Sequence, residues 1–308
     1  MSAIAETDDQ DNSSPTPTNP HIAALDDRLR ELFPADSAHL SILCKGLGGA
    51  PYGGNHPDFF AHACGLSLAP EHLERIRLGY VMLAAYYFLF DAAADNHLQH
   101  PTDSLYLPHL LTGALTEFTL VCLAVDPAKL VPLHTLVRRY LAANASAIKN
   151  EQLISSRPLL EDQPEEFYSI VGRSNAVLLL YDLLSLITDR APDDRVTDIV
   201  TWLAYYIQMA DDLGDWRDDY KNGRYTSFLR RCFARHDAVI DEPGLEEEVL
   251  LGGAFEERSA IVINGLAALL DKIDALPYRM EALQAYVTRQ KDRIYAVLKD
   301  RVTAKTQA

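Results

Sequence analysis

Residues 205–224 read YYIQMADDLGDWRDDYKNGR, and this stretch decides which fold the sequence is compatible with. Asp211, Asp215 and Asp219 recur every four residues, so in a helix their carboxylates lie on one face over two turns. The residues just before them, IVTWLAYYIQMA (199–210), are almost all apolar and include no Lys or Arg. The stretch therefore predicts an apolar helix whose C-terminal end carries a row of carboxylates.

A second helix of the same kind is predicted over residues 71–95, EHLERIRLGYVMLAAYYFLFDAAAD. Asp91 and Asp95 share one face at its C-terminal end, where the helix dipole disfavours negative charge. No Lys or Arg occurs from Leu78 through Ala128 to balance them. One acidic run alone is usually a solvated helix face, but two runs that each follow an apolar helix favour a cation-binding site.

The donor types in these two runs indicate which cation they suit. Carboxylate oxygens, with no CxxC motif and no pair of His residues four apart, suit Mg²⁺ rather than zinc. Mg²⁺ is usually held by one or two carboxylates together with substrate phosphates, so we expect a phosphorylated substrate. Arg173, Lys221 and Arg224 are the predicted phosphate ligands, although a lone Arg in an apolar helix also fits a structural ion pair.

The rest of the chain is predicted to be helical. Periodicity of apolar residues favours further helices, and no segment alternates as a strand does. The predicted helices cover residues 22–33, 105–125, 129–155, 165–189, 193–222, 245–276 and 280–302. Residues 1–20 are acidic and rich in Pro, Ser and Thr, which is typical of a disordered tail. We therefore predict a tail over 1–20 and one all-α helical bundle over 21–308.

Composition narrows the function further. The 308-residue chain has a formal net charge of −16, which argues against nucleic acid as a partner and against an electrostatic membrane anchor. Its four cysteines are scattered, as expected in a reducing cytoplasm. The N-terminus lacks the pattern of a secretory signal. The apolar stretches are interrupted by Asp or Arg, so no transmembrane segment is expected and a cytoplasmic location is predicted.

These motifs resemble those of the class I isoprenoid synthase superfamily. The pattern from Gln208 through Asp219 to Gly223-Arg224 is similar to the second aspartate-rich motif of trans-prenyl diphosphate synthases. It also resembles the metal motifs of class I terpene cyclases and of squalene and phytoene synthases. Asp91 and Asp95 match the first and last positions of the first aspartate-rich motif, and Arg173-Ser174 resembles a Lys-Thr pair or the diphosphate-sensing Arg of cyclases.

The resemblance implies a Mg²⁺-dependent enzyme, with three ions when substrate is bound, that ionises a prenyl diphosphate. Two basic features of chain-elongating synthases are missing: a Gly-Lys-Arg segment near the N-terminus and an Arg-Arg pair after the first motif. Their absence favours cyclisation of a single substrate. The alternatives are a chain-elongating synthase, a head-to-head coupling enzyme, and a catalytically silent helical subunit of a partner synthase. Homodimers are common in the superfamily.

A hydrocarbon pocket is predicted beside the two acidic runs. Aromatic faces attract carbocations, although the same rings also fit ordinary core packing. In prenyl synthases the residues four and five before the first motif face the pocket floor, and here both are tyrosines, which predicts a C10 or C15 substrate. The predicted lining residues are Tyr86, Tyr87, Phe90, Tyr205, Tyr206 and Gln208.

Overall fold

The computed structural model describes residues 20–44, 56–65, 68–94, 98, 100–158, 164–173 and 175–307. Within these ranges the chain forms helices and no strand, so the predicted all-α fold class is confirmed. The predicted tail over residues 1–20 lies outside the described residues, except Pro20. The helices are α1 (Pro20–Leu32), α2 (Ser37–Leu43), α3 (His56–Phe59), α4 (Pro70–Ala94), η2 (Pro101–Tyr106), α5 (Leu107–Val125), η3 (Pro127–Lys129), α6 (Leu130–Ser155), α7 (Pro164–Arg173), α8 (Ala176–Ile187), α9 (Asp194–Lys221), α10 (Ser227–Ala234), α11 (Glu242–Leu250), α12 (Ala254–Asp274) and α13 (Glu281–Gln307).

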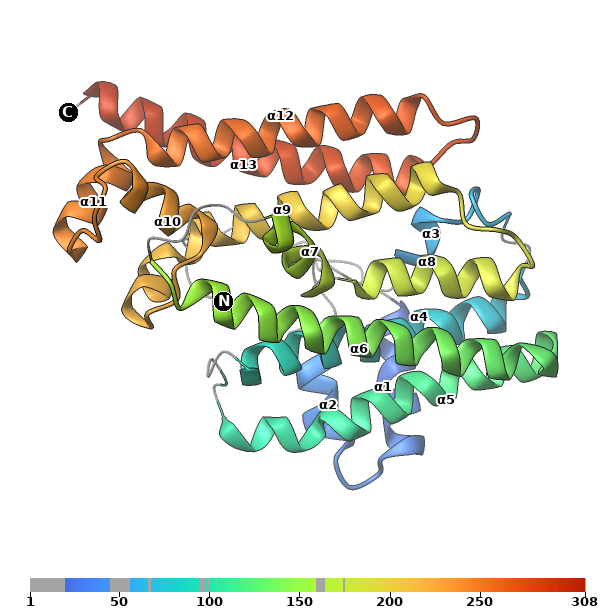
Figure 1. Cartoon of the computed structure of the whole chain (residues 1–308). Helices are drawn as coiled ribbons and strands as arrows, with labels where there is room; N and C mark the ends of the chain where they lie inside the picture. The colour runs from blue at the N-terminus through green and yellow to red at the C-terminus, as the bar shows by residue number, and fades with distance from the viewer. Residues whose placement is uncertain are drawn as a thin grey trace.

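The long helices pack in layers (Figure 1). Helices α12 and α13 form one outer layer, α8 and α9 lie in the middle, and α5 and α6 lie on the opposite side. Helix α4 packs closely on α5 and also contacts α8. Side chains from α4, α8, α9, α12 and α13 meet in one large apolar core, so the C-terminal ends of α4 and α9 are positioned by that core.

Helix α4 is buried over most of its length. Every residue from Leu78 to Ala85 is buried, because the sequence there is apolar on all sides of the helix. Pro70 opens the helix, where its fixed φ angle suits the first helical position. Asp91 lies in the last turn and is partly exposed, so the first acidic run begins where the buried helix emerges from the core.

The single helix predicted over residues 165–189 is wrong, because α7 ends at Arg173 and α8 begins at Ala176. The two helices are bent by 66°. The side-chain amide of Asn144 donates to the carbonyl oxygens of Gly172 at 3.3 Å and of Arg173 at 3.0 Å. These bonds satisfy acceptors that the end of α7 leaves without a partner in the helix.

The predicted helix over residues 245–276 is also divided. Helix α11 ends at Leu250 and α12 begins at Ala254. Gly253 lies between them with φ at +87°, a left-handed conformation that glycine adopts without steric cost. The break turns α11 and α10 back onto the end of α9. There, Leu213 and Trp216 join a second apolar cluster with residues of α10, α11 and α12.

Two helices have the length and composition of a membrane span, so the expectation of no apolar stretch of that length is wrong. They are Pro70–Ala94 and Pro101–Val125. The most apolar 18-residue window of each has a mean hydropathy of 1.2 and 1.4, respectively. A third candidate arises if α7 and α8 count as one bent span. In the fold, 61% of the α4 window is buried inside the protein, against 39% of the window that includes α5. The apolar sequence of α4 is thus largely accounted for by its place in the core.

Candidate functional site

The C-terminal end of α9 is shaped by the sequence Lys-Asn-Gly-Arg. Gly223 adopts φ at +67°, its N–H donates to the carbonyl of Tyr220 at 3.0 Å, and the N–H of Arg224 donates to that of Asp219 at 2.8 Å. This is the Schellman arrangement, which reverses the chain after a helix. The reversal brings the guanidinium of Arg224 back over the last turn, 3.5 Å from the Asp219 carboxylate.

The carboxylates of α9 lie where charge is costly. Asp219 is 4% exposed, and burial raises its pKa to about 8 despite Arg224, with the charges of Asp212 and Asp215 adding to the effect. The side chain of Asp211 is accessible, but the surrounding protein raises its pKa to about 7, helped by the same two neighbours. The charges on this helix end therefore exceed the positive charge that the protein supplies nearby.

The four-residue spacing of Asp211, Asp215 and Asp219 leaves Asp212 off their shared face, where a side chain is free to face solvent. Instead it is 7% exposed and accepts a hydrogen bond from the side-chain amide of Gln208 at 3.3 Å. Burial raises its pKa, while Arg258 of α12 opposes that shift most strongly, and Arg173 and Arg224 also oppose it. Asp212 thus belongs to the same charged region, and Gln208, predicted to line a hydrocarbon pocket, bonds to a carboxylate.

At the end of α4 the balance of charge is different. Asp91 accepts two hydrogen bonds from Arg173, from Nε at 2.9 Å and from Nη2 at 2.6 Å. The third nitrogen, Nη1, is paired with Glu151 of α6. The Arg173 side chain is only 6% exposed, whereas that of Asp91 is 32% exposed, so the guanidinium is withdrawn from water and Asp91 keeps partial access to it. Asp95, the other predicted ligand of this run, lies outside the described residues.

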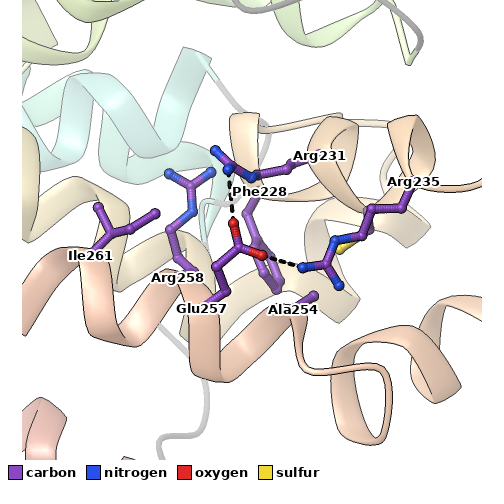
Figure 2. A pocket seen from close by; sticks show the side chains of 8 residues that line it. Phe228, Arg231, Arg235, Ala254, Glu257, Arg258 and Ile261 are labelled. Carbon is purple, nitrogen blue, oxygen red and sulfur yellow. Dashed lines mark hydrogen bonds and ion pairs between the residues drawn. The ribbon is translucent and has the colours of Figure 1, made fainter.

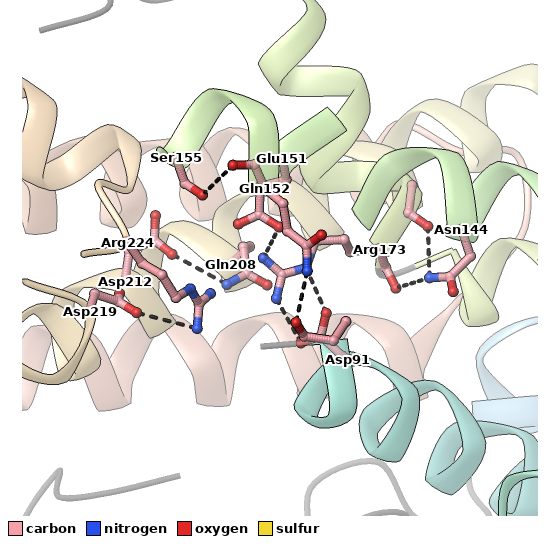
Figure 3. Close-up of polar contacts among 12 residues, drawn as sticks. Asp91, Asn144, Glu151, Gln152, Ser155, Arg173, Gln208, Asp212, Asp219 and Arg224 are labelled. Carbon is pink, nitrogen blue, oxygen red and sulfur yellow. Dashed lines mark hydrogen bonds and ion pairs between the residues drawn. The ribbon is translucent and has the colours of Figure 1, made fainter. Parts of the chain in front are cut away.

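Helix α6 links the two acidic helix ends (Figure 3). Its Gln152 side chain donates to the carbonyl of Ala94, the last residue of α4, at 2.8 Å. Its last residue, Ser155, accepts a 2.7 Å hydrogen bond from the backbone N–H of Tyr225, just after α9. The charge of Arg173 also partly offsets the rise in the pKa of Asp211. The structure therefore brings both predicted acidic runs to one region, with Arg173 between them.

The predicted phosphate ligands are not all brought together. Arg173 and Arg224 lie in this region, whereas Lys221 is exposed and pairs with Glu242 of α11 at 3.3 Å. Near the C-terminus, Arg293 of α13 is close enough for its charge to oppose the rise in the pKa of Asp211. Arg293 was not among the predicted phosphate ligands, and this interaction places its charge near the second acidic run.

The α4 aromatics fall into two groups. Tyr86 stacks on Phe90 with ring centroids 5.8 Å apart, and both rings are partly exposed. Tyr87, one turn before Asp91, is 5% exposed. Its hydroxyl is buried and has no hydrogen-bond partner in the described part of the chain, which costs free energy in a folded protein. Tyr87 therefore differs from an ordinary core ring, whose hydroxyl finds a partner.

The α9 aromatics pack against neighbouring helices. Tyr205 contacts Phe167 of α7 with ring centroids 5.0 Å apart. Tyr206 lies against Gly265 of α12, where a Cβ atom would come within 2.2 Å of the ring. Gly265 therefore leaves the space that the Tyr206 ring fills. The structure thus places Tyr206 at the interface of α9 and α12.

The donor set suits Mg²⁺. It consists of carboxylates, and those of Asp211 and Asp219 have raised pKa values that a nearby divalent cation would reverse. Among the described residues, no three His, Cys, Asp or Glu side chains already converge on one point. Mg²⁺ is usually bound in proteins by one or two carboxylates together with phosphate and water.

A small pocket lies apart from these residues, between α10 and α12 (Figure 2). Its volume of about 10 Å³ suits about one water molecule. Figure 2 shows Arg231 and Arg235 turned toward the carboxylate of Glu257, and both are ion-paired with it. None of the predicted site residues lines this pocket.

Glu151, Asp212 and Arg258 were not predicted as site residues. Glu151 and Arg258 come from helices whose sequences carry no motif, and only packing brings them near the aspartates. Asp212 lies off the face shared by Asp211, Asp215 and Asp219, so the four-residue spacing does not select it. Its neighbour Gln208, four residues earlier, was a usable signal, since residues so spaced are adjacent on a helix.

No family model matches the chain, and no curated protein matches it. Solved structures do match. A geranylgeranyl pyrophosphate synthetase from the archaeon Geoglobus acetivorans superposes with a TM-score of 0.63 at 12% identity, covering 89% of this chain and 96% of that one. A geranylgeranyl pyrophosphate synthase from Lactobacillus brevis gives 0.65 at 13% identity, covering 87% and 94%.

These matches define the fold of the chain as that of the isoprenoid synthases. More particularly, it is the fold of the trans-prenyl diphosphate synthases, since an octaprenyl pyrophosphate synthase from Helicobacter pylori also superposes. That structure gives a TM-score of 0.63 at 11% identity and covers 87% of this chain and 98% of its own. The resemblance seen in the sequence is thus confirmed at the level of the fold.

Proposed function

We propose that this protein is a Mg²⁺-dependent enzyme that ionises a prenyl diphosphate. The observation that carries the proposal is the position of Arg173. It pairs with Asp91 of the first acidic run, and its charge partly offsets the rise in the pKa of Asp211 in the second. Two carboxylate-bearing helix ends with a guanidinium between them suit a ligand that brings phosphates together with divalent cations.

Asp91, Asp211, Asp215 and Asp219 are the proposed metal ligands, and Asp95 is retained as a ligand from the sequence. Mg²⁺ bound there would offset the negative charge that grows on the diphosphate as it leaves. Arg173 and Arg224 would donate hydrogen bonds to the diphosphate oxygens, and their placement beside the carboxylates orients them before substrate arrives. Tyr87, buried one turn before Asp91, would limit the depth of the hydrocarbon pocket.

Chain elongation is the finer function that the solved structures favour. The structures that match are named as geranylgeranyl and octaprenyl pyrophosphate synthases, which are chain-elongating prenyltransferases, whereas the sequence favoured cyclisation. In elongation, the C–O bond to diphosphate breaks, the allylic carbon bonds to the double bond of isopentenyl diphosphate, and a proton leaves the adjacent carbon. The second candidate is a class I terpene cyclase, favoured because residues 78–128 contain no Lys or Arg for a second diphosphate.

The test is an incubation of purified protein with Mg²⁺ and geranyl, farnesyl or geranylgeranyl diphosphate, with and without isopentenyl diphosphate. A longer linear diphosphate that forms only with isopentenyl diphosphate supports elongation. A hydrocarbon or alcohol formed from one allylic diphosphate supports cyclisation, and a dimeric C30 or C40 hydrocarbon supports head-to-head coupling. Release of no diphosphate from any substrate would contradict the proposal and favour the silent partner subunit. A cytoplasmic location, a single domain and a homodimer stay predictions.

A further inference from the structure

Glu151 is a charged residue that the proposed reaction does not yet use. Its side chain is 14% exposed and pairs with Arg173 Nη1. It also adds negative potential at Asp219, whose pKa it helps to raise. A carboxylate in a region already rich in carboxylates is electrostatically unfavourable. The ion pair with Arg173 offsets this cost.

The guanidinium of Arg173 binds Asp91 and Glu151 through different nitrogens. Arginine presents its N–H groups on a rigid planar fork, and one edge matches the two oxygens of a carboxylate or phosphate. In this structure the Nε and Nη2 edge faces Asp91, at 2.9 and 2.6 Å. Nη1 is held by Glu151. The Nε and Nη2 edge can therefore change partners while Glu151 keeps the guanidinium in place.

We infer that Glu151 is a positioning residue that holds Arg173 by Nη1, so that the opposite edge passes from Asp91 to the diphosphate when Asp91 becomes a metal ligand. This inference rests on the proposed function. It explains why, among the described residues, Arg173 pairs with carboxylates of two different helices: Asp91 occupies the phosphate-binding edge in the free protein, and Glu151 prevents the side chain from following Asp91.

The backbone around this triad is fixed by other bonds. Asn144 holds the carbonyl of Arg173, and Gln152 holds the end of α4. Replacing Glu151 by glutamine should therefore leave the helices in place and change only the anchoring of the guanidinium. Glu166 offers a matched control, because it forms a buried ion pair with Arg230 of α10 and its side chain is 10% exposed.

The experiment measures binding by titration calorimetry on wild type, Glu151→Gln, Glu151→Asp and Glu166→Gln, using Mg²⁺ alone and inorganic diphosphate with saturating Mg²⁺. We expect Glu151→Gln to weaken diphosphate binding about tenfold, the energy of roughly one charged hydrogen bond, with Mg²⁺ binding unchanged. Glu151→Asp, which keeps the charge, should recover part of the affinity and serves if Glu151→Gln does not fold. Glu166→Gln should bind diphosphate like wild type.

Two results would overturn the inference while leaving the proposed function intact. Unchanged diphosphate affinity in Glu151→Gln, with a thermal destabilisation like that of Glu166→Gln, would make Glu151 a plain structural partner. Weaker binding of Mg²⁺ alone would make it a metal ligand instead. Wild-type protein that binds no diphosphate in the presence of Mg²⁺ would overturn the proposed function, and this inference with it.

Discussion

The C-terminal ends of α4 and α9 carry similar carboxylates in different surroundings. Asp91 on α4 is neutralised by two hydrogen bonds from Arg173. On α9, Asp219 has one arginine at 3.5 Å, and burial still raises its pKa to about 8. The first end thus already has a cation, supplied by a side chain that can change partners, whereas the second retains an unmet demand for positive charge. In the proposed site, Asp91 would exchange its bond to Arg173 for a metal ion, whereas the carboxylates of α9 would bind a metal ion without first losing a partner.

The most direct test of the difference between the ends of α4 and α9 is to remove one carboxylate from each. Asp91→Asn and Asp211→Asn should each lower turnover of a prenyl diphosphate by about 10²–10³-fold, the loss typical of one preorganised charge-stabilising group. Steady-state kinetics with Mg²⁺ would measure it. Asp218→Asn is the control, since Asp218 is exposed on α9. Full activity per folded molecule in Asp91→Asn would show that Asp91 is structural.

The thermal stability of metal-free protein should distinguish the two ends by pH. The Asp219 carboxyl keeps its proton up to about pH 8 in the folded state but loses it near pH 4 when unfolded. Its contribution to stability is therefore present below pH 4 and is lost as the pH rises toward 8.

In EDTA, Asp219→Asn should therefore gain about 2–4 °C in Tm relative to wild type at pH 8 and gain nothing at pH 4. Asp91→Asn should lower Tm at both pH values, because it removes a partner of Arg173. Equal effects of Asp219→Asn at the two pH values would contradict the charge imbalance at α9. Added Mg²⁺ should raise the wild-type Tm at pH 8 if the carboxylates bind it.

The aromatic residues before the two motifs should differ in their effect on substrate length. Tyr87→Ala should raise turnover of a C20 relative to a C10 or C15 diphosphate by about tenfold, because a ring about 6 Å deeper than the metal ligands is removed. Tyr87→Leu is the milder variant if the cavity prevents folding. Tyr206→Ala, which opens the contact with Gly265, is the control and should not shift the preference. An unchanged preference in the Tyr87 variants would remove Tyr87 as the pocket floor.

The smallest effect is expected at Lys221. Because it is exposed and pairs with Glu242, Lys221→Ala should change KM for the diphosphate substrate by less than about twofold, as for a surface ion pair. Arg224→Ala should raise KM about tenfold, since Arg224 lies beside Asp219. A similar rise in both variants would mean that Lys221 turns toward the site during turnover.

Much of this arrangement could be predicted from the sequence. The apolar runs before Asp91 and Asp211 predict α4 and α9, and the run in α4 is buried, as expected for a helix that is apolar on all sides, whereas most of the run in α9 is only partly buried. Lys-Asn-Gly-Arg after α9 specifies the turn that returns Arg224 to Asp219. Arg173 was predicted as a phosphate ligand, with a structural ion pair as the alternative. The structure shows ion pairs with Asp91 and Glu151, and in the proposal above Asp91 gives way to the diphosphate.

Other features of the site depend on contacts between helices that are far apart in the sequence, which no local sequence pattern predicts. Glu151 lies in a polar stretch of α6 with no motif, and its role appears only once α7 brings Arg173 beside it. The break between α7 and α8 has neither proline nor glycine at its centre, and it relies on an amide from Asn144 far along the chain. Asp212 is buried, and the charge of Arg258 on α12 acts on its carboxyl, which spacing within α9 cannot reveal.

The meeting of helix ends also has a consequence for how fast a ligand is captured. Helices α4 and α9 both end in this region, and α6 ends against them through Gln152 and Ser155. Each C-terminus carries about half a negative charge, on a chain whose formal net charge is −16. A free diphosphate thus approaches an entrance of its own sign, and its encounter with the protein should become faster as salt is added. That is the opposite of electrostatic steering between unlike charges, which salt weakens.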